Sequence, residues 1–216
     1  FTSMKEIEES AYKSIPLDIL KYVSEFCEKH EITYSLHYGT LLGAIRHKGY
    51  IPWDDDIDIV MPRKDYEKFR AIYNSNQYPL VDLLKDKHYP IGVAKIYDTN
   101  TFYYYHSIKR NIGLFIDVFV LDNFPDDLVE RKKWLSRIGI LKELNTMKNT
   151  KYMIALKSSC SLKRKVLITI GKLIPISSLY IHKRLEKLMR KYESVNCKCV
   201  GCPIDIINYN YAYSLL

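Results

Sequence analysis

Apolar and polar residues alternate along residues 32–38, where the apolar positions are Ile32, Tyr34, Leu36 and Tyr38. A period of two is typical of a half-buried β-strand. Gly39 permits a tight turn after this strand, and Thr40 is a residue type that caps helix N-termini. We therefore predict a strand, a Gly-Thr turn and a helix over residues 41–47. The N-terminus of such a helix offers free backbone N–H groups to an anion such as phosphate.

A second strand is predicted over residues 56–61, where polar and apolar residues alternate again. Because side chains of a strand alternate between its two faces, Asp56 and Asp58 share one face with Asp54, while Ile57 and Ile59 point into the core. Two carboxylates so placed are about 6.5–7 Å apart at Cα and both reach one hard cation or a pair of ions. Mg²⁺ takes oxygen ligands, often carboxylates together with substrate phosphates. We therefore predict a site for one or two Mg²⁺ ions.

Residues 112–121 are almost wholly apolar, which predicts a central strand covered on both faces. Asp117 interrupts this run, and a carboxylate in such a strand needs a metal ion or a hydrogen-bonding partner. A structural ion pair with Lys or Arg is the alternative to the metal. A further strand is predicted over residues 91–97, with residues 101–108 as its hairpin partner after a turn at 98–100.

Helical spacing of apolar residues predicts helices over residues 4–14 and 17–29, separated near Pro16, and over 66–73 and 126–149. Strands and helices together indicate an α/β (α+β) fold in which a mixed sheet is flanked by helices. We expect a catalytic core over residues 1–125 and a basic, helical C-terminal part over residues 126–216, packed together as one domain.

The chain has 216 residues, 47% of them hydrophobic, and a net charge of +8. Such a surface meets nucleic acid, anionic lipid or a polyanionic substrate. Basic residues alternate with apolar ones over residues 157–192, which fits either an amphipathic helix on an anionic membrane surface or a solvated helix over a local core. A transmembrane run and an apolar signal segment are both missing from the pattern. We expect a cytoplasmic protein, peripheral at the inner face of the membrane.

Three of the five cysteines are clustered at Cys197, Cys199 and Cys202. Zn²⁺ prefers four nitrogen or sulfur ligands, and Cys160 or His182 would supply the fourth. The spacing C-x-C-x-x-C without a second half is a partial signature, so reduced thiols without metal are the alternative.

The string YGTLLGAIR at residues 38–46, followed by IPWDDDIDI at residues 51–59, resembles the LicD family. This family lies in the nucleotidyltransferase superfamily, whose pattern is a Gly-Ser or Gly-Thr turn, a short helix and Asp-x-Asp in a strand. It includes bacterial phosphocholine transferases and fukutin-related transferases. The resemblance covers the first 125 or so residues and implies a nucleotidyltransferase-like core.

The resemblance implies a Mg²⁺-dependent transfer of phosphocholine from CDP-choline to a hydroxyl of a cell-surface glycan precursor, of teichoic acid or lipopolysaccharide type, with release of CMP. Asp56 and Asp58 would hold the metal, with Asp117 as third ligand and general base. Gly39 and Thr40 would cradle the donor phosphates. The partners are then a CDP-linked donor and a glycan acceptor, and we expect no nucleic acid.

Three further residues have two interpretations each. Lys95 contacts the nucleotide phosphates or is an ordinary edge-strand lysine. Arg46 contacts phosphate or pairs with the aspartate run. Trp53 offers its ring to the choline cation or packs in the core.

Two other functions stay open at this point. The same site would serve to transfer ribitol phosphate or a nucleotide. Alternatively, the chain is a non-catalytic basic module that binds nucleic acid or membrane.

Overall fold

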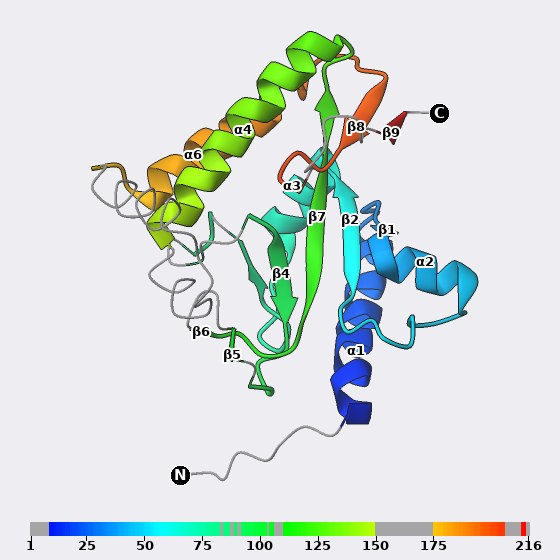
Figure 1. Ribbon diagram of the computed structural model, residues 1–216. Helices are drawn as coiled ribbons and strands as arrows, with labels where there is room; N and C mark the ends of the chain where they lie inside the picture. Colours follow the sequence, from blue (N-terminus) through cyan, green and yellow to red (C-terminus); the bar gives the residue numbers. More distant parts are fainter. Residues whose placement is uncertain are drawn as a thin grey trace. The chain divides into compact units, whose positions relative to one another are not determined.

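The computed structural model describes residues 9–82, 84–86, 89, 92–102, 104–105, 110–149, 175–205 and 213–214 (Figure 1). The chain forms two compact units. The first comprises Phe1–Leu80, Lys95–Tyr103 and Asn111–Phe119, and the second comprises Val81–Ala94, Tyr104–Arg110 and Val120–Leu216. The long strand β7 (Phe115–Phe124) contributes its first half to one unit and its second half to the other.

The central sheet has the strand order β1 (Ser35–Leu36), β2 (Asp58–Pro62), β7, β4 (Ala94–Tyr97), β3 (Leu80–Val81). Strand β1 runs antiparallel to β2, with Ser35 opposite Val60. The first four residues of β2 are all buried, as expected of a strand covered on both faces. The predicted mixed α/β fold with helices flanking the sheet is confirmed.

The N-terminal region forms one helix, α1 (Glu9–Lys29), with Pro16 inside it. The predicted break at Pro16 is therefore wrong. Proline removes one backbone hydrogen bond, but its fixed φ is compatible with a helix. Pro16 is itself buried and lies at helical spacing from the buried residues Ile19, Val23 and Cys27. Burial of Pro16 with this stripe outweighs the missing bond.

Helix α2 (Tyr38–Arg46) follows β1, and helix α3 (Arg63–Ile72) follows β2. The rings of Phe69 and Tyr73, at the C-terminal end of α3, stack with centroids 4.3 Å apart. The predicted hairpin of residues 101–108 with the strand before it is wrong. Strand β5 (Tyr104–Tyr105) pairs instead with β6 (Arg110–Asn111) in a separate two-stranded sheet, because β4 is already paired with β7 and β3.

The second unit contains the helices α4 (Leu128–Asn149) and α6 (Ser178–Met189), the 3₁₀ helix η2 (Arg190–Tyr192) and the strands β8 (Cys199–Gly201) and β9 (Tyr213–Ser214). Asp127 caps α4, since its Oδ1 accepts the Glu130 N–H at 2.7 Å. Strand β8 pairs antiparallel with the end of β7.

The core of the second unit lies between α4 and α6. Trp134, Leu135 and Ile138 of α4 pack with Leu185 and Met189 of α6. For α6, a local core therefore explains the apolar positions within the basic stretch. Residues 157–174, the first part of the predicted amphipathic segment, lie outside the described residues. Of the helices that are described, none combines the length and the low polarity that crossing a lipid bilayer requires.

Candidate active site

Three carboxylates of the first unit converge at the start of β2. Asp58 is the first residue of β2, Asp117 is the third residue of β7, and the Asp117 N–H donates to the Ile57 carbonyl at 2.8 Å. Carboxylate oxygens of Asp56, Asp58 and Asp117 all lie within 4.8 Å of one another. Oxygens at this spacing suit a divalent cation that takes oxygen ligands.

The local backbone differs from the prediction at Asp56. The strand begins only at Asp58, so Asp56 reaches the group from the preceding loop rather than from a shared strand face. This loop turns sharply, since the Asp54 N–H donates to the Ile51 carbonyl at 3.0 Å. Ile57 and Ile59 are buried in the core as predicted. The carboxylates therefore come together through the turn rather than along one strand face.

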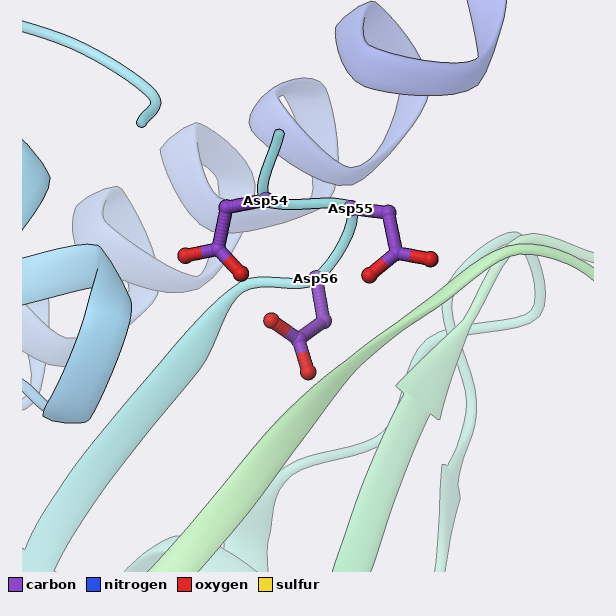
Figure 2. A group of neighbouring side chains, drawn as sticks. All are labelled: Asp54, Asp55 and Asp56. Carbon is purple, nitrogen blue, oxygen red and sulfur yellow. The ribbon is translucent and has the colours of Figure 1, made fainter. Parts of the chain in front are cut away.

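A second group of carboxylates lies on this loop. Asp54, Asp55 and Asp56 gather around the turn that leads into β2, and each offers an oxygen within 4.8 Å of the others (Figure 2). Asp56 belongs to both groups. The arrangement therefore has the connectivity of a two-ion site in which Asp56 is shared.

Helix α2 supports the first group through its opening turn. The Thr40 hydroxyl accepts the Asp58 N–H at 2.9 Å, and the His37 N–H donates to the Asp58 carbonyl at 2.9 Å. The predicted helix start at Thr40 is wrong: α2 begins at Tyr38, with His37 in the N-cap position. Thr40 does not cap its own helix because its hydroxyl is used to hold the first residue of β2.

Gly39 lies against the acidic loop. A Cβ atom at this position would collide with the Asp54 carboxylate. The absence of a side chain is therefore what lets Asp54 approach the start of α2. The position of Gly39 and Thr40 beside the carboxylates agrees with the predicted strand, turn, helix and acidic strand.

Lys95 lies under the carboxylates as a buried cation. Its side chain is in β4, only 2% of the residue is exposed, and its ammonium group forms an ion pair with Asp117 Oδ1. The ammonium also lies 3.7 Å from the centroid of the Phe115 ring. The edge-strand interpretation of Lys95 is wrong, because β4 lies between β7 and β3.

Close packing of these carboxylates and Lys95 shifts their pKa values. Burial, and then the charges of Asp56, Asp117 and Asp54, raise the pKa of Asp58 to about 7, while Lys95 acts in the opposite direction. Burial and the neighbouring aspartates also raise the pKa of Asp56. Burial lowers the pKa of Lys95, opposed chiefly by Asp117. The protein thus holds more negative charge here than Lys95 neutralises, which is the electrostatic setting of a cation site.

Tyr50 is a neighbour that the sequence did not single out. Burial and the charges of Asp56 and Asp54 raise its pKa to about 12. Its hydroxyl donates to the Lys13 carbonyl at 3.1 Å, and the Lys13 ammonium donates to the Pro52 carbonyl at 2.9 Å. These bonds tie the acidic loop to α1. Nothing in the sequence pattern signals them, because they join residues about 40 positions apart.

Arg46 and Trp53 gather around His47. The Arg46 Nε–H donates to His47 Nε2 at 2.9 Å, and the Trp53 ring lies 6.3 Å from the His47 ring. Trp53 is 78% exposed, so the core-packing interpretation is wrong. Arg46 thus contacts His47. The contact of Arg46 with phosphate and the contact of Trp53 with choline stay predictions.

The cysteine cluster lies in the second unit. Cys197 and Cys202 are buried and Cys199 is half-buried in β8. Burial raises the pKa of Cys202 to about 12, which keeps the thiol protonated. Across the described part of the chain, the groups of three or more potential metal ligands are the two aspartate groups, and these cysteines do not form another. Cys160 lies outside the described residues. The geometry therefore does not support the predicted Zn²⁺ site.

Comparison with known proteins adds an independent line of information. The family described as LicD/FKTN/FKRP, nucleotidyltransferase domain, matches residues 31–143. A lipopolysaccharide cholinephosphotransferase LicD of Haemophilus influenzae is 38% identical over 130 residues, which are 57% of this chain and 48% of that protein. An uncharacterised protein of Rickettsia typhi is 40% identical over 70 residues, 32% of this chain and 23% of that protein. An uncharacterised protein of Rickettsia prowazekii is 41% identical over 63 residues, 29% of this chain and 24% of that protein. The chain thus spans about half or less of the length of these relatives.

Proposed function

The chain belongs to the LicD/FKTN/FKRP family of nucleotidyltransferase domains, and on that premise we propose that it transfers phosphocholine from CDP-choline to a hydroxyl of a cell-surface glycan precursor. The relative in Haemophilus influenzae is named a lipopolysaccharide cholinephosphotransferase, which supports a precursor of lipopolysaccharide or teichoic acid type as acceptor. The observation that carries the proposal is the convergence of Asp56, Asp58 and Asp117 beside the first turn of α2.

The donor set fits Mg²⁺. All the candidate ligands are carboxylates, which are the hard oxygen ligands that Mg²⁺ prefers alongside substrate phosphates. The raised pKa of Asp58, caused by burial among like charges, indicates that the carboxylates are short of positive charge. Asp56, Asp58 and Asp117 would hold the first ion, and Asp54 and Asp55 would join Asp56 around a second. When bound, Mg²⁺ would neutralise the charge on the phosphoryl oxygens.

The reaction is a substitution at the choline-bearing phosphorus of the donor. The acceptor hydroxyl oxygen forms a new bond to this phosphorus while the bond to the CMP oxygen breaks, and CMP leaves with the electron pair. Asp117 takes the proton of the hydroxyl. Its Oδ1 is held by Lys95, so the side chain is oriented before the substrate arrives.

The start of α2 binds the donor phosphates in this proposal. Backbone N–H groups of Gly39 and Thr40 lie in its first turn, where the helix dipole favours negative charge. Lys95 is buried and paired with Asp117, so we assign it the positioning of that carboxylate rather than a direct phosphate contact.

Product analysis with several donors tests the proposal. The protein is incubated with CDP-choline, CDP-ribitol or nucleoside triphosphates, together with a glycan acceptor and Mg²⁺, and release of CMP or pyrophosphate is followed. We expect CMP from CDP-choline. CMP from CDP-ribitol alone, or pyrophosphate, would assign a different transfer to the same site.

Substitution of Asp58 separates an enzyme from a basic binding module. Asp58→Asn is expected to lower the rate by at least about a hundredfold, because it removes a charged metal ligand. The matched control is Asp18→Asn, which removes only the exposed ion pair with Lys21. Full function in Asp58→Asn would favour the non-catalytic alternative.

A further inference from the structure

Helix α2 carries its apolar stripe on the outside. Leu41, Leu42 and Ile45 follow the spacing i, i+1, i+4, which places them on one face of the helix. These three residues are between 39% and 65% exposed. A helix of a globular protein normally turns such a stripe toward the core. This helix does the opposite.

The inward side of α2 is built for close approach. Gly43 is the buried residue of the helix, and a Cβ atom there would lie 2.6 Å from the Gly49 carbonyl oxygen. Thr40 contacts β2 through its hydroxyl. The small residues therefore fix which face of α2 meets the protein, and the apolar stripe is left outside by the packing itself.

Trp53 extends the exposed apolar surface from the neighbouring loop. Its ring lies against His47, at the C-terminal end of α2. The loop that carries it is held to α1 by the bonds between Lys13, Tyr50 and Pro52. Exposure of Trp53 is thus a property of an anchored loop. A monomer rarely leaves several large apolar side chains together in water unless they meet a partner.

Basic residues end the stripe. Arg46, His47 and Lys48 follow directly on Ile45, and all three are exposed. A helix that lies in the interface of an anionic membrane typically has leucine and isoleucine on one face. It also has a tryptophan at its end and basic residues at the rim. The positive net charge of the chain acts in the same direction.

We propose that the exposed face of α2, together with Trp53, docks this chain on the surface of an anionic phospholipid bilayer. A second copy of the chain fits this face less well, because α2 has nine residues and a stable dimer uses about 20–30 residues a side. The first turn of α2 holds Asp58, so docking brings the carboxylates close to the lipid surface. If the proposed function holds, the acceptor at this surface is anchored in lipid. The docking itself does not depend on the proposed function.

Vesicle binding tests the proposal without any donor substrate. The protein is sedimented with vesicles of phosphatidylcholine alone or mixed with phosphatidylglycerol, in buffer with Mg²⁺. We expect binding to the mixed vesicles that weakens at high salt. The variant Leu42→Ser/Ile45→Ser is expected to bind at least about tenfold more weakly, because two apolar side chains no longer enter the interface. Ile140→Ser is the matched control, since Ile140 of α4 is 64% exposed and Ile45 is 65% exposed.

Trp53 provides a second readout. Brominated lipids quench a tryptophan that enters the bilayer, and Trp134 is buried in the second unit, so the quenched emission should disappear in Trp53→Phe. Thermal melting confirms that the variants fold. The proposal is overturned if the protein ignores mixed vesicles at low salt, or if the double variant binds like the wild type. It is also overturned if sedimentation velocity shows an oligomer that the double variant abolishes. Failure of phosphocholine transfer would leave vesicle binding unchanged, so the two proposals fail separately.

Discussion

Asp58 combines three properties at the scale of a single residue. It is buried at the start of β2, its N–H and carbonyl are bonded to Thr40 and His37 at the start of α2, and its side chain lies among like charges. Burial and the adjacent aspartates raise its pKa to about 7. A carboxylate in this condition is stabilised by any cation that enters the group, which couples metal binding to the loss of a proton.

Metal affinity should therefore depend on pH around neutrality. Below a pKa of about 7, Asp58 is mostly protonated without metal, and the ion must displace the proton. We expect the apparent affinity for Mn²⁺, used as a probe, to fall about fivefold between pH 7 and pH 6 from this group. Isothermal titration calorimetry in buffers of different ionisation enthalpy measures both the affinity and the released proton. An affinity that is constant over this range would contradict the assignment of Asp58 as a ligand.

Lys95 is the counter-ion of the same group, and its removal gives a second prediction. Lys95→Met leaves the buried end of Asp117 without its cation, so the metal-free protein should lose on the order of 2–3 kcal/mol of stability. Mg²⁺ should raise the melting temperature of this variant more than that of the wild type, because the ion then supplies the missing charge. Lys21→Met, which breaks only an exposed pair, is the control. An equal response of both proteins to Mg²⁺ would contradict the proposed balance between Lys95 and the metal.

Individual residues differ in how far the sequence predicts them. The sequence and the family resemblance single out Asp56, Asp58 and Asp117, but period-two alternation does not explain their convergence, because Asp56 lies in the loop before β2. The pairing of Lys95 with Asp117 did not follow, because it depends on which strand lies beside β7. Trp53 was misjudged in its core-packing interpretation because a tryptophan is usually buried, and no local pattern reveals that its loop is tied outward to α1.

At the scale of elements, the start of α2 and the start of β2 are joined by two hydrogen bonds. The Asp58 N–H donates to the Thr40 hydroxyl, and the His37 N–H donates to the Asp58 carbonyl. The sequence predicts both elements and their order. It misplaces their ends, because the end of β1, the start of α2 and the start of β2 are fixed by hydrogen bonds between segments about 20 residues apart.

Replacement of Thr40 tests the connection between α2 and β2. Thr40→Val keeps the shape but removes the acceptor for the Asp58 N–H, which should cost about 1–2 kcal/mol in the free energy of unfolding and reduce transfer activity. Thr40→Ser keeps the hydroxyl and should restore most of both. Chemical denaturation and the CMP-release assay measure the two effects. A loss in Thr40→Ser with little loss in Thr40→Val would mean that the methyl group, rather than the hydrogen bond, is what matters.

At the scale of the whole molecule, the two units have different chemical characters. The first unit contains the carboxylates, and the second has a core of aromatic and aliphatic residues between α4 and α6. His182 of α6 is fully buried in the second unit, where its Nε2 lies 2.9 Å from Asn145 Oδ1 of α4. The sequence predicted helices in this region, but the buried contact between residues 37 positions apart carries no local signal.

The stability of the second unit should fall in acid. Burial lowers the pKa of His182 to about 4, from 6.5 in the unfolded chain. The folded state keeps the imidazole neutral while the unfolded state is protonated below pH 6.5, so stability is lost as the pH falls from 6.5 through 4. The loss should approach about 3 kcal/mol, which is what such a pKa difference implies. Circular dichroism during urea unfolding at several pH values measures it.

Two variants isolate this effect. His182→Gln should flatten the pH dependence, while His47→Gln, at an exposed position of the first unit, should leave it as in the wild type. Asp58 acts in the opposite direction, since its raised pKa favours the folded state as the pH falls below about 7. The comparison of variants removes that contribution. A wild-type curve that His182→Gln does not change would show that other groups govern the acid response.

The central claim is that Asp56, Asp58 and Asp117 hold a divalent cation at which the donor phosphates bind. Anomalous diffraction from crystals grown with Mn²⁺ and CDP-choline tests it most directly. The account predicts an anomalous peak about 2.0–2.2 Å from an oxygen of each of the three carboxylates, next to the donor phosphates at the start of α2. A structure with the nucleotide bound elsewhere, or with Lys95 as the sole cation among these carboxylates, would contradict it.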